Sequence, residues 1–311
     1  MDYVPGQRLV DCWDDMGVPQ KTRTAKDLAR AMAEMFALTA SHCGVLLRDC
    51  SLNDSQRSLR YHSGPIAAEV HTEVVDGDFI IGPVNDITFL QLTKTVPASL
   101  CGPFATERAF LEACAYSGGT KVQDKLDKWP IERMFEIYDV IRPLYTPQVD
   151  SSAPFHFAHA DLSVTNLMVD PKSGEVTGLI DWEMAGFRPA WLCATSGTWF
   201  DDDSCRFVVE GYQDGPDGYG EDTETDADLR QVFLVALSAH SPTLLEHNRK
   251  GVELRSMFYN LCNESTMNTT TWIKEYEKYE WHVTERGQFP FDVEKWQDDL
   301  LDLFEELVSY C

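Results

Sequence analysis

The stretch that decides the fold is residues 155–189, FHFAHADLSVTNLMVDPKSGEVTGLIDWEMAGFRP. Its apolar, β-branched and aromatic runs predict three short strands, at residues 155–159, 167–169 and 176–182. A turn at residues 171–174, with the sequence Pro-Lys-Ser-Gly, separates the second strand from the third. We therefore expect a compact β unit in the middle of the chain.

Four polar residues stand at the ends or turns of these strands within 23 positions: His159, Asp161, Asn166 and Asp181. Polar groups on the loops of a rigid scaffold converge readily on one cleft, so we expect these side chains to lie together. Phosphoryl transfer from a nucleotide needs a carboxylate that deprotonates the attacking hydroxyl and oxygen ligands that hold magnesium on the phosphates. Magnesium prefers one or two carboxylates, a neutral oxygen donor and retained waters, which an Asn–Asp pair suits.

The same residues form two motifs with a recognisable spacing. The first is His159-Ala160-Asp161-Leu162-(x3)-Asn166, and the second is Ile180-Asp181-Trp182-Glu183-x-Ala185-Gly186. Together they resemble the H-x-D-L-x-x-x-N and I-D-[WF]-E signatures of the aminoglycoside phosphotransferase and choline kinase family, which has a protein kinase-like fold.

The resemblance implies ATP- and magnesium-dependent transfer of a phosphoryl group to a hydroxyl group of a small molecule. It also implies a role for each motif residue: Asp161 as the catalytic base, Asn166 and Asp181 as the magnesium ligands, and His159 as a support for the loop. Ala160 departs from the family, which usually has glycine there. We expect the loop to tolerate alanine at this position.

Two other segments carry a looser resemblance. Residues 1–9 look like the hinge of the family, which implies that Tyr3 and Val4 contact ATP, and residues 101–104 look like a recurring segment. With the hinge there, the small lobe that carries the phosphate-covering loop and the phosphate-binding lysine is expected upstream of residue 1. The chain has no G-x-G-x-x-G or G-x-x-x-x-G-K-[ST] motif. The alternative therefore stays open that the chain is a non-catalytic pseudokinase, or a module that binds a ligand or a partner.

The fold class that we expect is α/β (α+β). It is a protein kinase-like fold made mainly of the helical C-terminal lobe, with a short β unit that carries the catalytic and metal loops. One domain is expected to span residues 1–311. Within it we expect a hinge-like start at 1–9, a decorated helical region at 24–150, the catalytic core at 155–189 and a C-terminal helical region at 229–311.

Helical periodicity outside the β unit predicts a series of helices, at residues 24–40, 106–115, 131–144, 229–239, 252–262, 271–279 and 293–310. Residues 50–103 are expected to form an irregular connection with a short extended segment at 79–81. The acidic, glycine-rich run at 214–228 is expected to be a solvated loop. Six apolar residues of the second and third helices are expected in the core: Phe110, Leu111, Met134, Phe135, Ile137 and Ile141.

The charge of the chain bears on its partners. With 51 acidic and 26 basic side chains among 311 residues, its formal charge is −25, which repels nucleic-acid phosphates and anionic lipids. We therefore expect a small-molecule substrate and neither nucleic acid nor membrane as a partner. The negative charge is compatible with a cationic acceptor substrate, although a role in solubility alone explains such a charge. Nothing in the sequence indicates an oligomeric state.

The cysteines and the N-terminus bear on the compartment. Nine cysteines, without a C-x-x-C pair, predict reduced thiols. The N-terminus has neither a basic nor an apolar signal region, and no apolar run reaches the roughly 18 residues of a membrane span. We expect a cytoplasmic protein.

A rival interpretation takes His156, His159 and Asp161 as ligands of a zinc-like ion in a hydrolase. Two histidines three positions apart on a strand point to opposite faces, which argues against shared ligation.

Three further features each have two interpretations. The first is a set of aromatic residues that could form a cage for a cationic ligand or pack between helices: Trp191, Trp199, Tyr212, Trp272, Tyr276 and Trp281. Packing is favoured. The acidic run at 201–203 could contact a cationic acceptor or be a solvated surface. The amphipathic segment at 298–310 could bind a partner or dock on its own domain, and docking is favoured.

Overall fold

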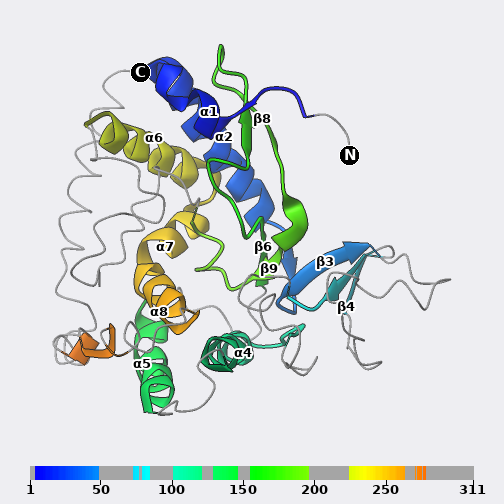
Figure 1. The fold of residues 1–311 in the computed structure, drawn as a ribbon, viewed down its shortest axis with the longest axis vertical. Helices are drawn as coiled ribbons and strands as arrows, with labels where there is room; N and C mark the ends of the chain where they lie inside the picture. Colours follow the sequence, from blue (N-terminus) through cyan, green and yellow to red (C-terminus); the bar gives the residue numbers. More distant parts are fainter. Residues whose placement is uncertain are drawn as a thin grey trace.

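The computed structural model describes residues 4–48, 73–76, 79–84, 101–120, 129–145, 155–195, 224–262, 270, 272–274 and 276–277. These residues form a mixture of helices and antiparallel sheets (Figure 1). The mixed helix and sheet composition agrees with the α+β class expected from the sequence. None of the described helices is both long and apolar enough to cross a membrane.

The first sheet has three strands in the order β1-β7-β8, with bounds Gln7–Arg8, Leu167–Val169 and Val176–Leu179. Both of its pairings are antiparallel. The β7–β8 hairpin is therefore extended on one side by the beginning of the chain. Figure 1 shows this hairpin beside the blue N-terminal helices.

The second sheet has six strands in the order β2-β6-β9-β3-β5-β4, and its pairings are antiparallel. The bounds are β2 Thr39–Ala40, β3 Gly44–Arg48, β4 Glu73–Asp76, β5 Phe79–Gly82, β6 Phe155–Ala158 and β9 Gly186–Arg188. Strands β6 and β9 flank the β7–β8 hairpin in the sequence and pair with each other, with Phe157 opposite Phe187. This pairing brings the two ends of the central β unit together.

Seven helices of the described residues accompany these sheets. Their bounds are α1 Leu9–Cys12, α2 Val18–Phe36, α4 Glu107–Thr120, α5 Trp129–Tyr145, α6 Glu224–His240, α7 Pro242–Lys250 and α8 Val252–Cys262, with short 3-10 turns η1 Trp13–Asp15 and η4 Trp182–Met184. Helix α2 packs along α6, and α4 and α5 both pack against α8. Figure 1 shows α4, α5 and α8 grouped at one end and α2 with α6 at the other.

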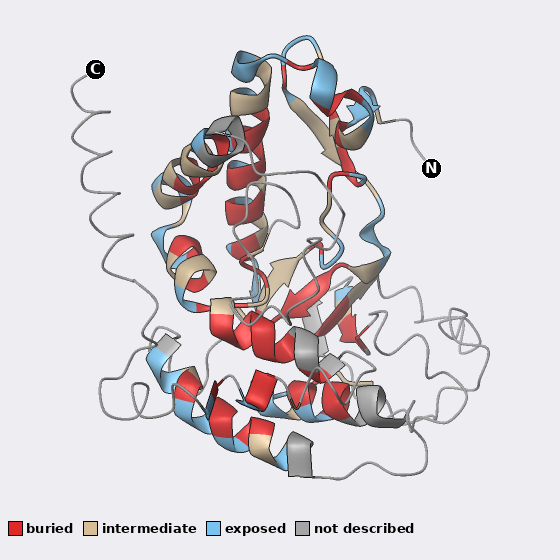
Figure 2. Ribbon diagram, turned by 60° about the vertical axis from the view of Figure 1, so that its left-hand side comes forward, coloured by how far each residue is buried: buried red, intermediate tan, exposed pale blue. Residues whose placement is uncertain are grey.

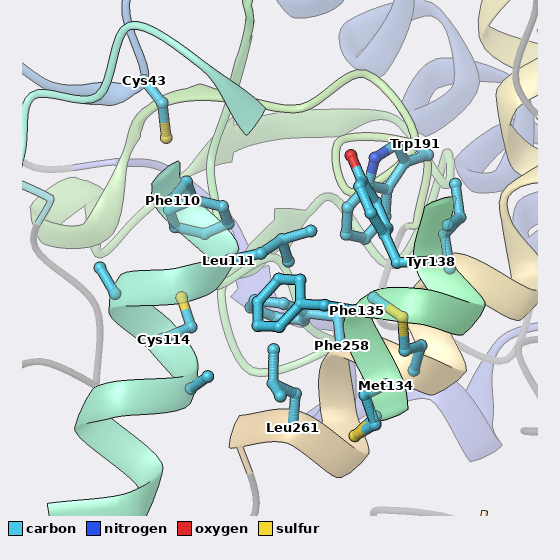
Figure 3. Close-up of a cluster of buried hydrophobic side chains, with 14 of the residues drawn as sticks. Cys43, Phe110, Leu111, Cys114, Met134, Phe135, Tyr138, Trp191, Phe258 and Leu261 are labelled. Atoms are coloured by element: carbon cyan, nitrogen blue, oxygen red, sulfur yellow. The ribbon is translucent and has the colours of Figure 1, made fainter. Parts of the chain in front are cut away.

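Two clusters of buried apolar side chains form the core, and Figure 2 shows the buried residues on the inner sides of the helices. One cluster joins α4, α5 and α8 to the six-stranded sheet, and the other joins α2 and α6 to the β7 strand. All six predicted core residues are buried. Figure 3 shows Phe110 and Leu111 from α4 close to Phe135 and Phe258.

The first predicted helix has different ends in the structure. Helix α2 begins at Val18, not residue 24, because Gly17 precedes it in an extended conformation and Pro19 suits the first turn. It ends at Phe36, not residue 40. Thr39, which lies inside the predicted range, is exposed and pairs in β2 with His156 of β6. The pairing with a distant strand overrides the local helical pattern.

Several strand and loop predictions also need correction. Strands β2, β3 and β4 were not predicted, and they lie within the region 24–150 that we expected to be a decorated helical region. The extended segment expected at 79–81 is confirmed as β5. Strand β8 ends at Leu179 and not at residue 182, because the chain turns into η4. Most of 50–103 lies outside the described residues.

The C-terminal half differs in two places. Helix α6 begins at Glu224, inside the run 214–228 that we predicted as loop. Helix α7 was not predicted, whereas α8 has the predicted bounds 252–262. Of the predicted helix at 271–279, residues 272–274 and 276–277 are described and helical. The segments 201–203 and 293–310 lie outside the described residues.

Five cysteines of the described part of the chain are free: Cys12, Cys43, Cys101, Cys114 and Cys193. All except Cys101 are fully buried. Burial raises the pKa of the Cys193 thiol far above its usual range. The prediction of reduced thiols is therefore confirmed for these residues.

Candidate active site

The loop expected to be catalytic, residues 159–166, begins where β6 ends at Ala158. His159 follows and is buried, with 1% of its surface exposed. Ala160 adopts the left-handed conformation with φ of 63°, and the exposed Asp161 comes directly after it. Left-handed backbone at a non-glycine residue is uncommon and tends to occur at functional sites. It gives a physical reason why glycine is usual at this position in the family that the motif resembles.

Asn166 links the two ends of the catalytic loop. Its Nδ2 donates to the backbone oxygen of Asp161 at 2.7 Å and to Oδ2 of Asp161 at 3.2 Å. Its backbone N–H donates to the carbonyl of Ser163 at 3.0 Å. Because the NH₂ group must face these acceptors, the hydrogen-bond network fixes the amide orientation. The amide oxygen of the buried Asn166 accepts from the Thr165 hydroxyl at 3.4 Å, and its second lone pair is left to bind a cation.

The loop expected to bind the metal, residues 180–186, follows β8 and is joined to the expected catalytic loop through Ile180. The Ile180 N–H donates to the backbone oxygen of Asn166 at 3.0 Å, and Nε2 of His159 donates to the Ile180 carbonyl at 2.8 Å. Asp181 comes next, exposed and with φ of 69°. The structure thus brings together all four polar residues that the motifs singled out.

The charges of this site influence one another. A hydrogen bond with Asp181 raises the pKa of Glu183, and burial and the charges of Asp181 and Asp161 raise it further. Burial lowers the pKa of His159, although its bond to Ile180 and the two aspartates oppose this effect. His159 is therefore neutral near pH 7 with its proton on Nε2. Three carboxylates that interact in this way favour a bound cation.

Val4, expected to contact ATP, lies against the same hairpin. A Cβ atom at Gly178 would lie 2.7 Å from Cγ1 of Val4, so glycine is needed for this close approach. The hydroxyl of Thr177 donates to the Pro5 carbonyl. Val4 therefore lies against β8 at Gly178, which is three residues before Asp181 in the sequence. Tyr3, the other expected ATP contact, lies outside the described residues.

The zinc-hydrolase interpretation is wrong. His156 Nδ1 donates to the carbonyl of Phe36 at 2.7 Å, and its ring stacks on the Phe36 ring with centroids 3.8 Å apart. His159 is engaged with Ile180 instead. In the part of the chain that the structure describes, no group of three or more His, Cys, Asp or Glu side chains is arranged to hold a metal ion. Magnesium at Asn166 and Asp181 would use an amide oxygen and one carboxylate.

The comparison with protein families settles the membership of the chain. A family model described as the phosphotransferase enzyme family matches residues 1–221. The chain belongs to the phosphotransferase enzyme family. No curated protein and no solved structure matches it. Membership in the phosphotransferase enzyme family implies a protein kinase-like fold, with which the mixture of helices and antiparallel sheets is consistent.

In this member of the family, the aromatic residues considered as a cage for a cationic ligand belong to the core wherever the structure describes them. Trp191, Trp272 and Tyr276 are buried, so packing is confirmed for these three. Trp199, Tyr212 and Trp281 lie outside the described residues. Two residues of the second motif received no role from the sequence, Trp182 and Glu183. Their place in the motif was a signal, but their contacts become visible only in three dimensions.

Proposed function

We propose that the chain is an ATP- and magnesium-dependent phosphotransferase that acts on a hydroxyl group of a small molecule. The observation that carries the proposal is the pair of bonds from Asn166 Nδ2 to Asp161. Together with the two bonds to Ile180, it joins the base and both metal ligands in one site. Membership of the phosphotransferase family supports this class of reaction.

Each residue then has one task. Asp161, exposed at the loop, accepts the proton of the acceptor hydroxyl. The Asn166 amide oxygen and the Asp181 carboxylate hold magnesium, which supplies charge neutralisation for the phosphates when it is bound. His159 stays neutral and orders the loop through Ile180. Val4 and Tyr3 are the proposed contacts to the nucleotide base.

The acceptor is proposed to carry a positive charge. Asp161, Asp181 and Glu183 interact with one another at the surface of the site. A cationic group on the acceptor would lower the repulsion among these carboxylates. The overall charge of −25 would also raise the local concentration of such a molecule.

Calorimetric titration of the purified chain with ATP and magnesium tests the proposal. We expect Asp181→Asn to weaken binding of magnesium-ATP by about tenfold or more, because an amide replaces the carboxylate that binds the metal. Glu34→Gln is the control: it also removes one negative charge, but from an exposed position on α2, and should bind as the wild type does.

The outcomes separate the proposed function from its alternative. Binding that depends on Asp181, followed by turnover with amino alcohols, supports the phosphotransferase. Binding of magnesium-ATP without turnover of any acceptor favours the non-catalytic alternative. If the wild-type chain does not bind magnesium-ATP, the catalytic proposal fails for this chain.

A further inference from the structure

Trp182 makes three contacts next to the metal loop while 44% of its surface stays exposed. Its Nε1 donates to the carbonyl of Leu179 at 2.8 Å. Its ring lies 4.7 Å from the His159 ring and stacks near Phe157 with centroids 6.3 Å apart. An exposed tryptophan with these contacts joins the end of β8 to the end of β6.

The two neighbours of Asp181 in the sequence are both held in place by contacts. The residue before it, Ile180, is held at its N–H by Asn166 and at its carbonyl by His159. The residue after it is Trp182, whose carbonyl accepts from the N–H of Ala185 at 3.0 Å. Asp181 itself has the left-handed conformation, which is unfavourable for a residue with a side chain unless its neighbours enforce it.

Trp182 also packs against the histidine that holds this loop. His159 is 1% exposed, and the Trp182 ring is one of its contacts. A hydrogen bond shielded from water is stronger than an exposed one, so the indole favours the bond from His159 to Ile180. Loss of the indole would loosen Ile180 and Asp181 together.

We propose that Trp182 is a positioning residue that holds Asp181 ready to bind magnesium. The inference rests on the proposed function, since it takes Asp181 as a metal ligand. Trp182 acts through His159 and Leu179 and needs no contact with the acceptor. Partners that orient a metal ligand typically affect metal affinity by roughly 10- to 100-fold when they are lost.

The test measures binding of magnesium-ATP by calorimetry, and thermal unfolding with and without magnesium-ATP, for the full chain. We expect Trp182→Leu to weaken binding about tenfold and to lose most of the gain in Tm that the wild type shows on binding. Trp182→Phe keeps a ring but loses the Nε1 donor, and should be weaker by about threefold. Phe79→Ala is the control, because Phe79 is similarly exposed, at 40%, and lies on β5, a strand that carries none of the motif residues.

The readouts distinguish positioning from simple loss of stability. A purely structural role would lower Tm without ligand but leave the gain on binding intact, and that result overturns the inference. Wild-type affinity in Trp182→Leu overturns it as well; if that variant does not fold, wild-type affinity in Trp182→Phe decides in the same way. Absence of any Tm gain in the wild-type chain instead contradicts the proposed function itself.

Discussion

Ala160 provides a test at the scale of a single residue. Its φ of 63° places it in the left-handed region, which costs a residue with a Cβ atom about 1–2 kcal/mol. Glycine avoids this cost but loses about 0.5–1 kcal/mol more backbone entropy on folding. We therefore expect Ala160→Gly to raise the free energy of unfolding by about 0.5–1 kcal/mol, measured by urea denaturation.

Ala31 is the matched control for this substitution. It lies in the interior of α2, where glycine costs about 1 kcal/mol relative to alanine. Ala31→Gly should therefore lower the free energy of unfolding while Ala160→Gly raises it. A loss of stability in both variants would contradict the strain assigned to Ala160.

The residue types of the site could be predicted from the sequence, whereas their backbone geometry could not. Asp161, Asn166 and Asp181 are recognisable because phosphoryl transfer restricts the side chains that serve it. Nothing in the sequence indicated that Asp181 has a left-handed backbone, since the apolar run predicts extended structure through Trp182. The contacts of Trp182 depend on β6, which lies more than 20 positions earlier.

The element that carries the metal loop is anchored on α2. The buried hydroxyl of Thr24 donates to the carbonyl of Gly174 at 2.8 Å, in the turn between β7 and β8. We expect Thr24→Val to lower the free energy of unfolding by about 1–3 kcal/mol, because it keeps the shape but removes the donor to a buried carbonyl. Urea denaturation at neutral pH measures the loss.

Thr22→Val controls for the exchange of threonine for valine. Thr22 lies on the same helix, is partly exposed and has no hydrogen bond from its hydroxyl in the structure. Its substitution should change the free energy of unfolding by less than about 0.5 kcal/mol. Equal losses in the two variants would mean that helix propensity, and not docking of the turn, explains the effect.

The helices and strands differ in how well they can be predicted from their local sequence. Helices α5 and α8 were predicted close to their bounds, and α4 close to its start although it continues to Thr120, because each repeats its apolar residues over several turns. Strand β2 has two residues and owes its conformation to pairing with β6, so no local pattern could indicate it. Strands β3 and β4 join the same sheet and were missed too, since short strands carry little periodicity.

At the scale of the whole molecule, buried histidines join three distant segments. His156 on β6 stacks on Phe36 at the end of α2, and His247 on α7 lies with its ring 6.0 Å from the same phenylalanine. Burial lowers the pKa of both histidines, that of His247 from 6.5 to about 4. Four other charged or titratable groups act on His247: His156, Glu246, Arg255 and Arg142. Among them only Glu246 favours the protonated form.

The lowered pKa of His247 predicts how the stability of the protein depends on pH. Above about pH 6.5 the residue is neutral in both states and contributes no pH dependence. Between pH 6.5 and about 4 the His247 imidazole binds a proton in the unfolded chain but not in the folded chain, so stability falls as the pH falls. By pH 5 the loss from His247 is about 2 kcal/mol. His247→Gln should therefore reduce the difference in free energy of unfolding between pH 7.5 and pH 5 by about this amount.

His240→Gln is the control that tests whether burial of His247 causes this pH dependence. His240 is an exposed histidine in the last turn of α6, one residue before the cap of α7. Urea denaturation of His240→Gln at both pH values should give nearly the wild-type difference. If the free energy of unfolding of His247→Gln changes between pH 7.5 and pH 5 as much as that of the wild type, the prediction is contradicted. The loss of stability in acid would then come from groups outside the contact of α2, β6 and α7. A smaller difference in His247→Gln alone would mean that the buried contact of α2, β6 and α7 makes the stability of the protein depend on pH.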